Sequence, residues 1–124
     1  MSGKASSIIA AVALILMIIA IYANALYIKS TTDHILVLIE RSEDVNEKSM
    51  ETITEIYDYW NKSISILKLS VSQEDLEEIS LIINEAQICA ENDNSEEYNR
   101  TMARLRRAIE DIRDPERILI RNIF

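Results

Sequence analysis

The longest apolar stretch of the chain lies near its amino terminus, over residues 5–28. It contains no charged residue, and Ser6, Ser7 and Asn24 are its polar interruptions. A helix needs roughly 20 apolar residues to cross a bilayer core about 30 Å thick. The stretch also lacks Gly and Pro, so one helix can satisfy all of its backbone hydrogen bonds. We therefore predict a transmembrane signal anchor over residues 1–29.

A cleaved signal peptide is the alternative interpretation of the same stretch. Residues 23–25 read Ala-Asn-Ala, which matches the small-x-small cleavage pattern and would place the cut after Ala25. The apolar run continues past this site to Ile28, which favours a retained anchor. A buried core helix is a third reading, and a charge-free run of this length argues against it.

The charges that flank the stretch give a weak indication of orientation. Lys4 and the amino terminus favour a cytoplasmic start, and Lys29 partly offsets them at the other end. Both an anchor in this orientation and a signal peptide place the rest of the chain outside the cytoplasm. We predict a single-pass protein of the cytoplasmic membrane with its C-terminal domain extracytoplasmic.

Beyond the anchor, apolar and small residues recur at steps of three and four, as on one face of an amphipathic helix. The series is Ile35, Leu38, Ser42, Val45, Ser49, Ile53, Ile56, Trp60, Ile64 and Leu67. It predicts one long helix over residues 35–67. Thr31 or Thr32 is a suitable cap for its start. Equally, nothing in residues 30–33 prevents the membrane helix from running straight on.

Trp60 lies among Tyr57, Tyr59 and Ile64. Large aromatic residues dominate burial in small cores, so we predict that Trp60 anchors the core. An exposed binding hot spot is the alternative.

Residues 73–90 form the next predicted helix. Ser72 followed by Asp75 resembles a capping box, with Asp in place of the usual Glu. Acidic side chains fill the first turns, where they suit the helix dipole. The apolar face is wide, because Leu81, Ile82 and Ile88 extend it beyond the core spacing, and we expect it to contact two neighbouring helices.

Residues 91–95 form the clearest loop, and Asn94 or Ser95 can cap a further helix. That helix carries the cleanest heptad in the chain, at Tyr98, Met102, Leu105, Ile109 and Ile112. Asp114 and Pro115 end it and begin a short C-terminal helix. The apolar tail at residues 118–124 is expected to dock, on the bundle or on a partner.

These patterns predict an all-α protein. Gly3 and Pro115 are the only Gly and Pro, so the chain lacks the turn signals of β-hairpins. We expect an N-terminal transmembrane helix followed by a small antiparallel helical bundle of three helices plus the short C-terminal helix. Residues 30–124 would form this single acidic domain.

The charge balance limits the classes of partner. The net charge is −8; setting aside Lys4 and Lys29, which flank the anchor, leaves 11 basic and 21 acidic residues, or −10, on the domain. This argues against binding nucleic acid or anionic lipid through bulk charge. From Tyr98 onward, however, there are seven arginines.

Two interpretations of these arginines stay open. A basic helix packs beside an acidic one, or an arginine surface binds an acidic partner. The candidate partner-binding residues are Arg100, Arg104 and Arg107, together with Ile123 and Phe124 in the tail.

Catalytic and cofactor chemistry finds little support. Cys89 is the only cysteine, and we expect it to be a small buried hydrophobe. His34 is the only histidine, and we expect it to be an interfacial or capping residue. A phosphate-binding glycine loop is impossible with a single glycine. The carboxylates of Glu74, Asp75, Glu77 and Glu78 could attract a divalent cation, but an acidic helix start explains them. We expect no enzyme activity, no cofactor and no metal.

The overall pattern resembles a family of short bacterial single-span membrane proteins, domain of unknown function 4363. The matching features are the apolar span, Trp60, Leu69-Ser70-Val71, Glu77-Glu78-Ile79 and the terminal Asn122-Ile123-Phe124. The chain departs from the family pattern at Ser72-Gln73-Glu74, which stands in place of a His-containing segment. The resemblance implies a membrane-anchored helical protein and carries no known activity.

Two functions fit these expectations. The first is a membrane-anchored accessory or scaffold protein that acts through helix–helix contacts, with a protein partner or by self-association. The second is an extracytoplasmic helical domain that senses a ligand or cation.

Overall fold

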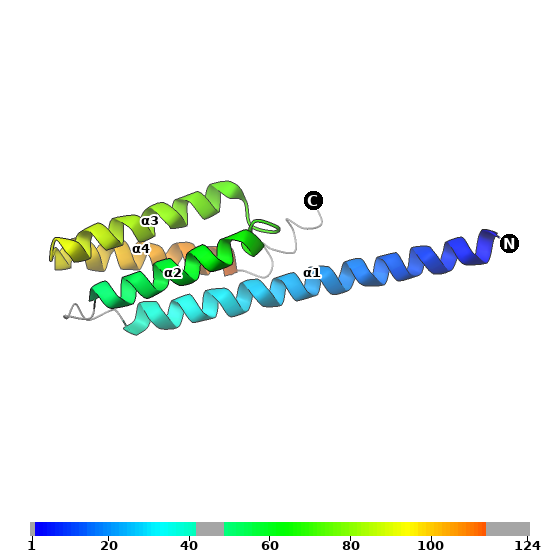
Figure 1. Cartoon of the computed structure of the whole chain (residues 1–124), viewed down its shortest axis with the longest axis horizontal. Coiled ribbons are helices and arrows are strands. Elements are labelled where there is room, and N and C mark those ends of the chain that lie inside the picture. Colours follow the sequence, from blue (N-terminus) through cyan, green and yellow to red (C-terminus); the bar gives the residue numbers. More distant parts are fainter. Residues whose placement is uncertain (1, 42–48, 114–124) are drawn as a thin grey trace.

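The computed structural model describes residues 2–41 and 49–113, and these residues form four helices. They are α1 (Ser2–Arg41), α2 (Ser49–Leu67), α3 (Gln73–Glu91) and α4 (Ser95–Arg113). Each helix runs antiparallel to the one before it, and α1 extends far beyond the other three (Figure 1). The predicted all-α class, with a long apolar first helix followed by a helical bundle, is confirmed.

Helix α1 continues without a break from the apolar stretch into the bundle, which decides between the two alternatives for residues 30–33. Thr32 caps no helix end; its Oγ1 donates to the backbone oxygens of Ile28 (2.8 Å) and Lys29 (3.0 Å). Such back-bonding satisfies a threonine hydroxyl inside a helix. By length and composition α1 is the one helix in the described ranges that could cross a membrane, and its apolar window is not buried in the bundle.

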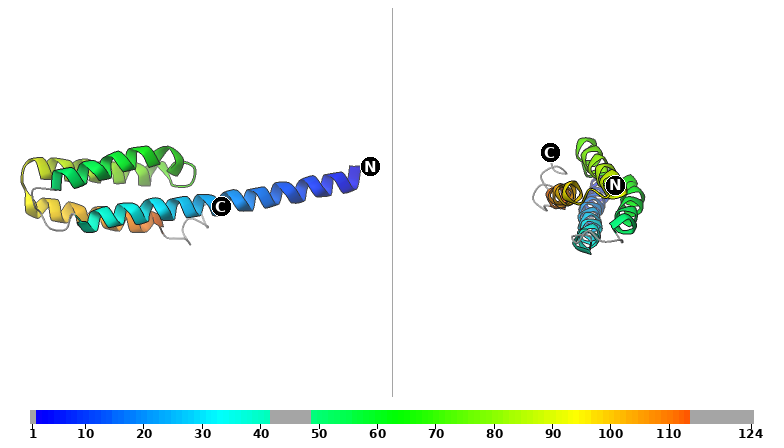
Figure 2. Two further views of the ribbon diagram at one scale, coloured as in Figure 1. Left: turned by 60° about the horizontal axis from the view of Figure 1, so that its bottom comes forward. Right: turned by 90° about the vertical axis from the view of Figure 1, so that its left-hand side faces the viewer.

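The second half of α1 is the fourth member of the bundle. α1 contacts α2 and α4, and α3 contacts the same two helices from the other side. The view along the bundle shows this square arrangement (Figure 2). At its centre lie apolar residues from all four helices: Ile28, Ile35, Leu38, Ile39, Ile53, Ile56, Trp60, Leu67, Leu76, Ile79, Ile83, Tyr98, Leu105 and Ile109.

The single helix predicted over residues 35–67 is wrong, because α1 ends at Arg41 and α2 begins at Ser49. Residues 42–48 lie outside the described part of the chain. Their sequence, Ser-Glu-Asp-Val-Asn-Glu-Lys, offers one large apolar side chain for burial. A helix continued through them would lie exposed, whereas reversal at this point packs the apolar faces of α1 and α2 against each other.

Trp60 is buried in the core, as predicted, with 1% of its surface exposed. Its indole Nε1 donates a hydrogen bond of 2.8 Å to Ser80 Oγ on α3. The Ser80 hydroxyl in turn donates to the backbone oxygen of Leu76 at 3.0 Å. The largest side chain of the core thus has its one polar group satisfied, and it ties α2 to α3.

The predicted helix starts are confirmed at α3 and α4. Ser72 is the N-cap of α3, and its hydroxyl accepts a hydrogen bond from the Asp75 amide at 3.3 Å. Asn94 Oδ1 accepts from the Glu97 amide at 3.4 Å, just before α4. Both caps satisfy amides that have no partner within their helix. The predicted C-terminal helix, with residues 118–124, lies outside the described residues.

Helix α3 ends in a Schellman-type turn whose left-handed residue is not glycine. Asp93 has φ 52°, its amide donates to the Ala90 oxygen, and the Asn94 amide donates to the Cys89 oxygen. A residue with a Cβ is disfavoured in this conformation, and a negative charge is disfavoured at a helix C-terminus.

Asp93→Gly is therefore expected to raise the free energy of unfolding by about 0.5–1 kcal/mol. Urea unfolding of the detergent-solubilised chain, followed by far-UV circular dichroism, measures the change. Asp93→Asn is the control, since it removes the charge and keeps the Cβ. A gain from Asp93→Asn as large as that from Asp93→Gly would contradict a backbone origin.

Candidate interaction surface

The outer face of α3 exposes two large apolar side chains. Leu81 is 64% and Ile88 52% exposed. The expectation that α3 contacts two helices is confirmed. Of the three residues expected to widen its apolar face, Ile82 is buried in the core, whereas Leu81 and Ile88 are exposed. α2 and α4 cover the arc of α3 that carries Leu76, Ile79 and Ile83, and the opposite arc has no helix above it in the described structure.

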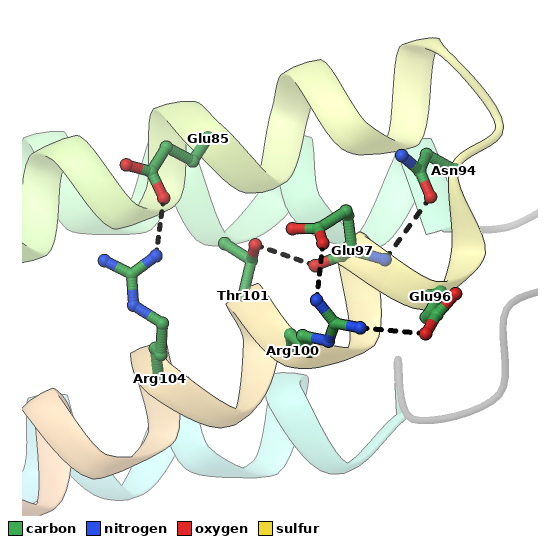
Figure 3. Close-up of polar contacts among 7 residues, drawn as sticks. All are labelled: Glu85, Asn94, Glu96, Glu97, Arg100, Thr101 and Arg104. Carbon is green, nitrogen blue, oxygen red and sulfur yellow. Dashed lines mark hydrogen bonds and ion pairs between the residues drawn. The ribbon is translucent and has the colours of Figure 1, made fainter.

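Arg104 joins this face of α3 to α4. Its Nη1 donates to Glu85 Oε2 at 2.8 Å (Figure 3). Glu85 lies four residues after Leu81 and three before Ile88, so the three side chains share one helical face. The ion pair thus places Arg104 beside an exposed apolar stripe. We call Leu81, Glu85, Ile88, Arg100 and Arg104 the α3–α4 surface.

Arg100 is held within its own helix. Its guanidinium binds Glu96 Oε1 and Glu97 Oε1, each at 2.8 Å (Figure 3). Glu97 also fixes the start of α4, because its amide donates to Asn94 and its carbonyl oxygen accepts from Thr101 Oγ1. Exposed ion pairs of this kind contribute roughly 0–1 kcal/mol each, so they orient Arg100 more than they stabilise the fold.

Arg107 lies in a hollow of about 340 Å³ between α3 and α4. Arg104 shares the hollow, and so do the carboxylates of Asp75, Glu78 and Asp111. This mixture of signs gives no site for a ligand of one charge. The interpretation that the arginine-rich helix packs beside an acidic helix is confirmed, while a partner-binding role for Arg100, Arg104 and Arg107 stays a prediction.

Ile123 and Phe124, the other two candidate partner-binding residues, lie outside the described residues. Their role also stays a prediction.

A groove of about 670 Å³ runs between α2 and α3 on the other side of α3. Its apolar lining includes Ile64, Val71, Leu76 and Leu81. Polar side chains line the rest of it: Lys68, Gln73, Glu77, Ser80 and Asn84. Leu81 belongs to both the groove and the α3–α4 surface, so the two features form one continuous outer face of α3.

The lone Cys89 and His34 have ordinary surroundings. Cys89 is partly buried against the core, as expected of a small hydrophobe. His34 is exposed inside α1, so it caps no helix end, and its ring centroid lies 4.2 Å from that of Tyr59. Residues 2–41 and 49–113 contain no group of three or more His, Cys, Asp or Glu side chains placed to hold a metal ion.

Sequence reasoning identified the arginines and missed the exposure of Leu81 and Ile88. The sequence shows that Leu81 and Ile88 share a helix face with Glu85. It does not show how many helices pack around α3, and that number decides which apolar residues of a wide face stay exposed.

Comparison with known proteins gives no match to the chain among family models, curated proteins or solved structures. The resemblance to domain of unknown function 4363 therefore stays a prediction.

Proposed function

We propose that the chain is a non-enzymatic, membrane-anchored accessory or scaffold protein on the outer face of the cytoplasmic membrane. The observation that carries the proposal is the dual use of α1. Its first part exposes apolar residues from Ile8 to Ile19, and its second part buries Ile28, Ile35 and Leu38 in the bundle. One helix thus supplies both the membrane segment and one wall of the domain.

This arrangement favours contacts with other membrane proteins. A domain joined rigidly to a span stays within one domain length of the bilayer. Partners that share the membrane therefore meet it at a high effective concentration, and a modest surface suffices for association.

The α3–α4 surface has the composition of a small interface. Leu81 and Ile88 supply an apolar centre, and the Arg104–Glu85 ion pair supplies a polar rim. Apolar anchors with a polar surround, and enrichment in arginine, are typical of protein interfaces. The spacing of Leu81, Glu85 and Ile88 suits a partner helix that lies along α3.

Photocrosslinking in native membranes tests the proposal. A photoreactive amino acid at Leu81 or Ile88 is expected to capture a discrete second protein, whereas one at Glu55, exposed on α2, is not. Introducing Leu81→Glu should reduce capture from position 88 by about tenfold, the result of losing roughly 1.4 kcal/mol of binding. Circular dichroism should be unchanged, because Leu81 is exposed.

Two results would contradict the binding of a separate partner protein at this surface. Equal capture from positions 81, 88 and 55 would mean random collision. Capture of a second copy of the chain alone would assign the surface to self-association.

Ligand sensing is a second candidate, supported by the groove between α2 and α3. Its volume lies within the range of roughly 300–1,000 Å³ that small-molecule sites occupy. A small molecule that enters it would raise the melting temperature of the bundle. For the cation version, a calcium or magnesium titration that leaves the melting temperature unchanged would count against it.

A further inference from the structure

The turn between α2 and α3 carries the most exposed large apolar side chain that the structure describes. Leu69 is 77% exposed, more than any large apolar residue of the apolar stretch of α1. Ile66, one turn earlier, is 41% exposed. Both side chains are therefore accessible to a second surface at this end of the bundle.

The turn holds Leu69 outward by its own hydrogen bonds. The Leu69 amide donates to the Ile66 oxygen at 3.1 Å, and the Val71 amide donates to the Leu67 oxygen at 2.8 Å. Leu67 and Val71 on either side are buried in the core. Because both neighbours point inward, the side chain between them is directed away from the bundle.

The turn lies at the end of the bundle that faces the apolar stretch. α2 runs antiparallel to α1, so its last residues lie beside the part of α1 where packing begins (Figures 1 and 2). That part includes Ala25 and Tyr27, which pack against the core, and Ile28, which is fully buried. Tyr22, one turn further out, is 66% exposed. Tyrosines favour the membrane–water interface, which places the interface at this level.

We infer that Ile66 and Leu69 insert into the interfacial layer of the lipid bilayer and give the bundle a second attachment to the membrane. The inference rests on the proposed insertion of α1. We assign lipid as the partner of Ile66 and Leu69 for two reasons. The turn lies beside the end of the apolar stretch of α1, and no described helix covers these two side chains.

The attachment is apolar in origin. Lys68 and Lys29 lie at this end, but Glu74 and Asp75 follow in the first turn of α3, and Arg113 is paired with Asp33 at 2.7 Å. The local charges of both signs nearly cancel, so anionic lipid is not required. Lys68 can extend its ammonium group to the phosphate layer while its stem stays among the acyl chains.

Lipid-depth measurements on the full chain test the inference. The background is Cys89→Ala in nanodiscs of phosphatidylcholine, and an environment-sensitive fluorophore is attached at Lys68→Cys, which leaves Ile66 and Leu69 intact. Ile15→Cys, in the apolar stretch, and Asn92→Cys, in the α3–α4 loop at the opposite end, serve as reference positions. Nitroxide groups are placed on the lipids at a shallow depth in one set of nanodiscs and at a deep position of the acyl chain in a second set.

The fluorophore at position 68 is expected to be quenched by the shallow nitroxide, and the one at position 92 is not. The double variant Ile66→Ser/Leu69→Ser should remove most of the quenching at position 68. If position 68 behaves like position 92 while position 15 is quenched by deep nitroxides, the second attachment is overturned and the anchor stands. If position 15 is also unquenched, the proposed anchoring fails as well.

Discussion

Replacing Trp60 with alanine is expected to lower the free energy of unfolding of the bundle by about 3–5 kcal/mol. The change removes the largest buried side chain and leaves a cavity between α2 and α3. It also removes the indole donor to Ser80 Oγ. A small domain has only about 5–15 kcal/mol in total, so much of the population should unfold at moderate temperature. Urea unfolding of the solubilised chain, followed by far-UV circular dichroism, measures the loss.

Two further variants separate the causes of this loss. Trp60→Phe keeps most of the ring and loses the hydrogen bond, and the Ser80 hydroxyl still bonds to Leu76, so a smaller effect is expected. Tyr57→Ala removes an aromatic ring from an exposed site on the same helix and should cost well under the Trp60→Ala value. Equal losses for Trp60→Ala and Tyr57→Ala would contradict the placement of Trp60 in the core.

Arginine at both Ile15 and Ile18 is expected to release the chain from the membrane. Both side chains are exposed in the middle of the apolar stretch. On a biological insertion scale, an arginine at the centre of a span costs about 2.5–3.5 kcal/mol and an isoleucine contributes about −0.3 to −0.6 kcal/mol. The two changes together oppose insertion by roughly 6–8 kcal/mol. Alkaline extraction of membranes should then release the variant and retain the parent chain.

The matched control places the same substitutions outside the apolar stretch. Leu81→Arg with Ile88→Arg adds the same charge at exposed positions of α3 and should leave the chain in the membrane fraction. A parent chain that extracts fully, or that lacks residues 1–25 by intact mass, would contradict a retained anchor and favour the cleaved signal peptide.

The starts of α3 and α4 and the burial of Trp60 could be predicted from the sequence, because interactions between residues close in the chain determine them. The pair Ser72 and Asp75 predicted the start of α3, and Asn94 the start of α4. The spacing around Trp60 predicted its burial. Each of these signals depends on residues within one or two turns of each other.

The break between α1 and α2 could not be predicted from the spacing of apolar residues. That spacing shows which residues share a helix face, but it does not show whether the chain continues as one helix or turns back. Residues 35 to 41 and residues 49 to 67 keep one phase across the intervening segment, so a continued helix and a reversed one give the same pattern. The cross-helix pair of Arg104 with Glu85 depends on the register of α3 against α4. The loop and the core packing together determine that register, so it could not be predicted from the spacing of residues along the chain.

The unbroken course of α1 also determines which side of its apolar stretch shares a direction with the bundle. Positions separated by eighteen residues point in the same direction, since this equals about five turns of 3.6 residues. Met17 therefore shares its direction with Ile35, and Ala10 with Ile28, both of which face the core. If the apolar stretch spans the membrane as proposed, a neighbouring span that packs on the Ala10 and Met17 side would lie beneath the bundle. A span on the opposite side would not be covered by it.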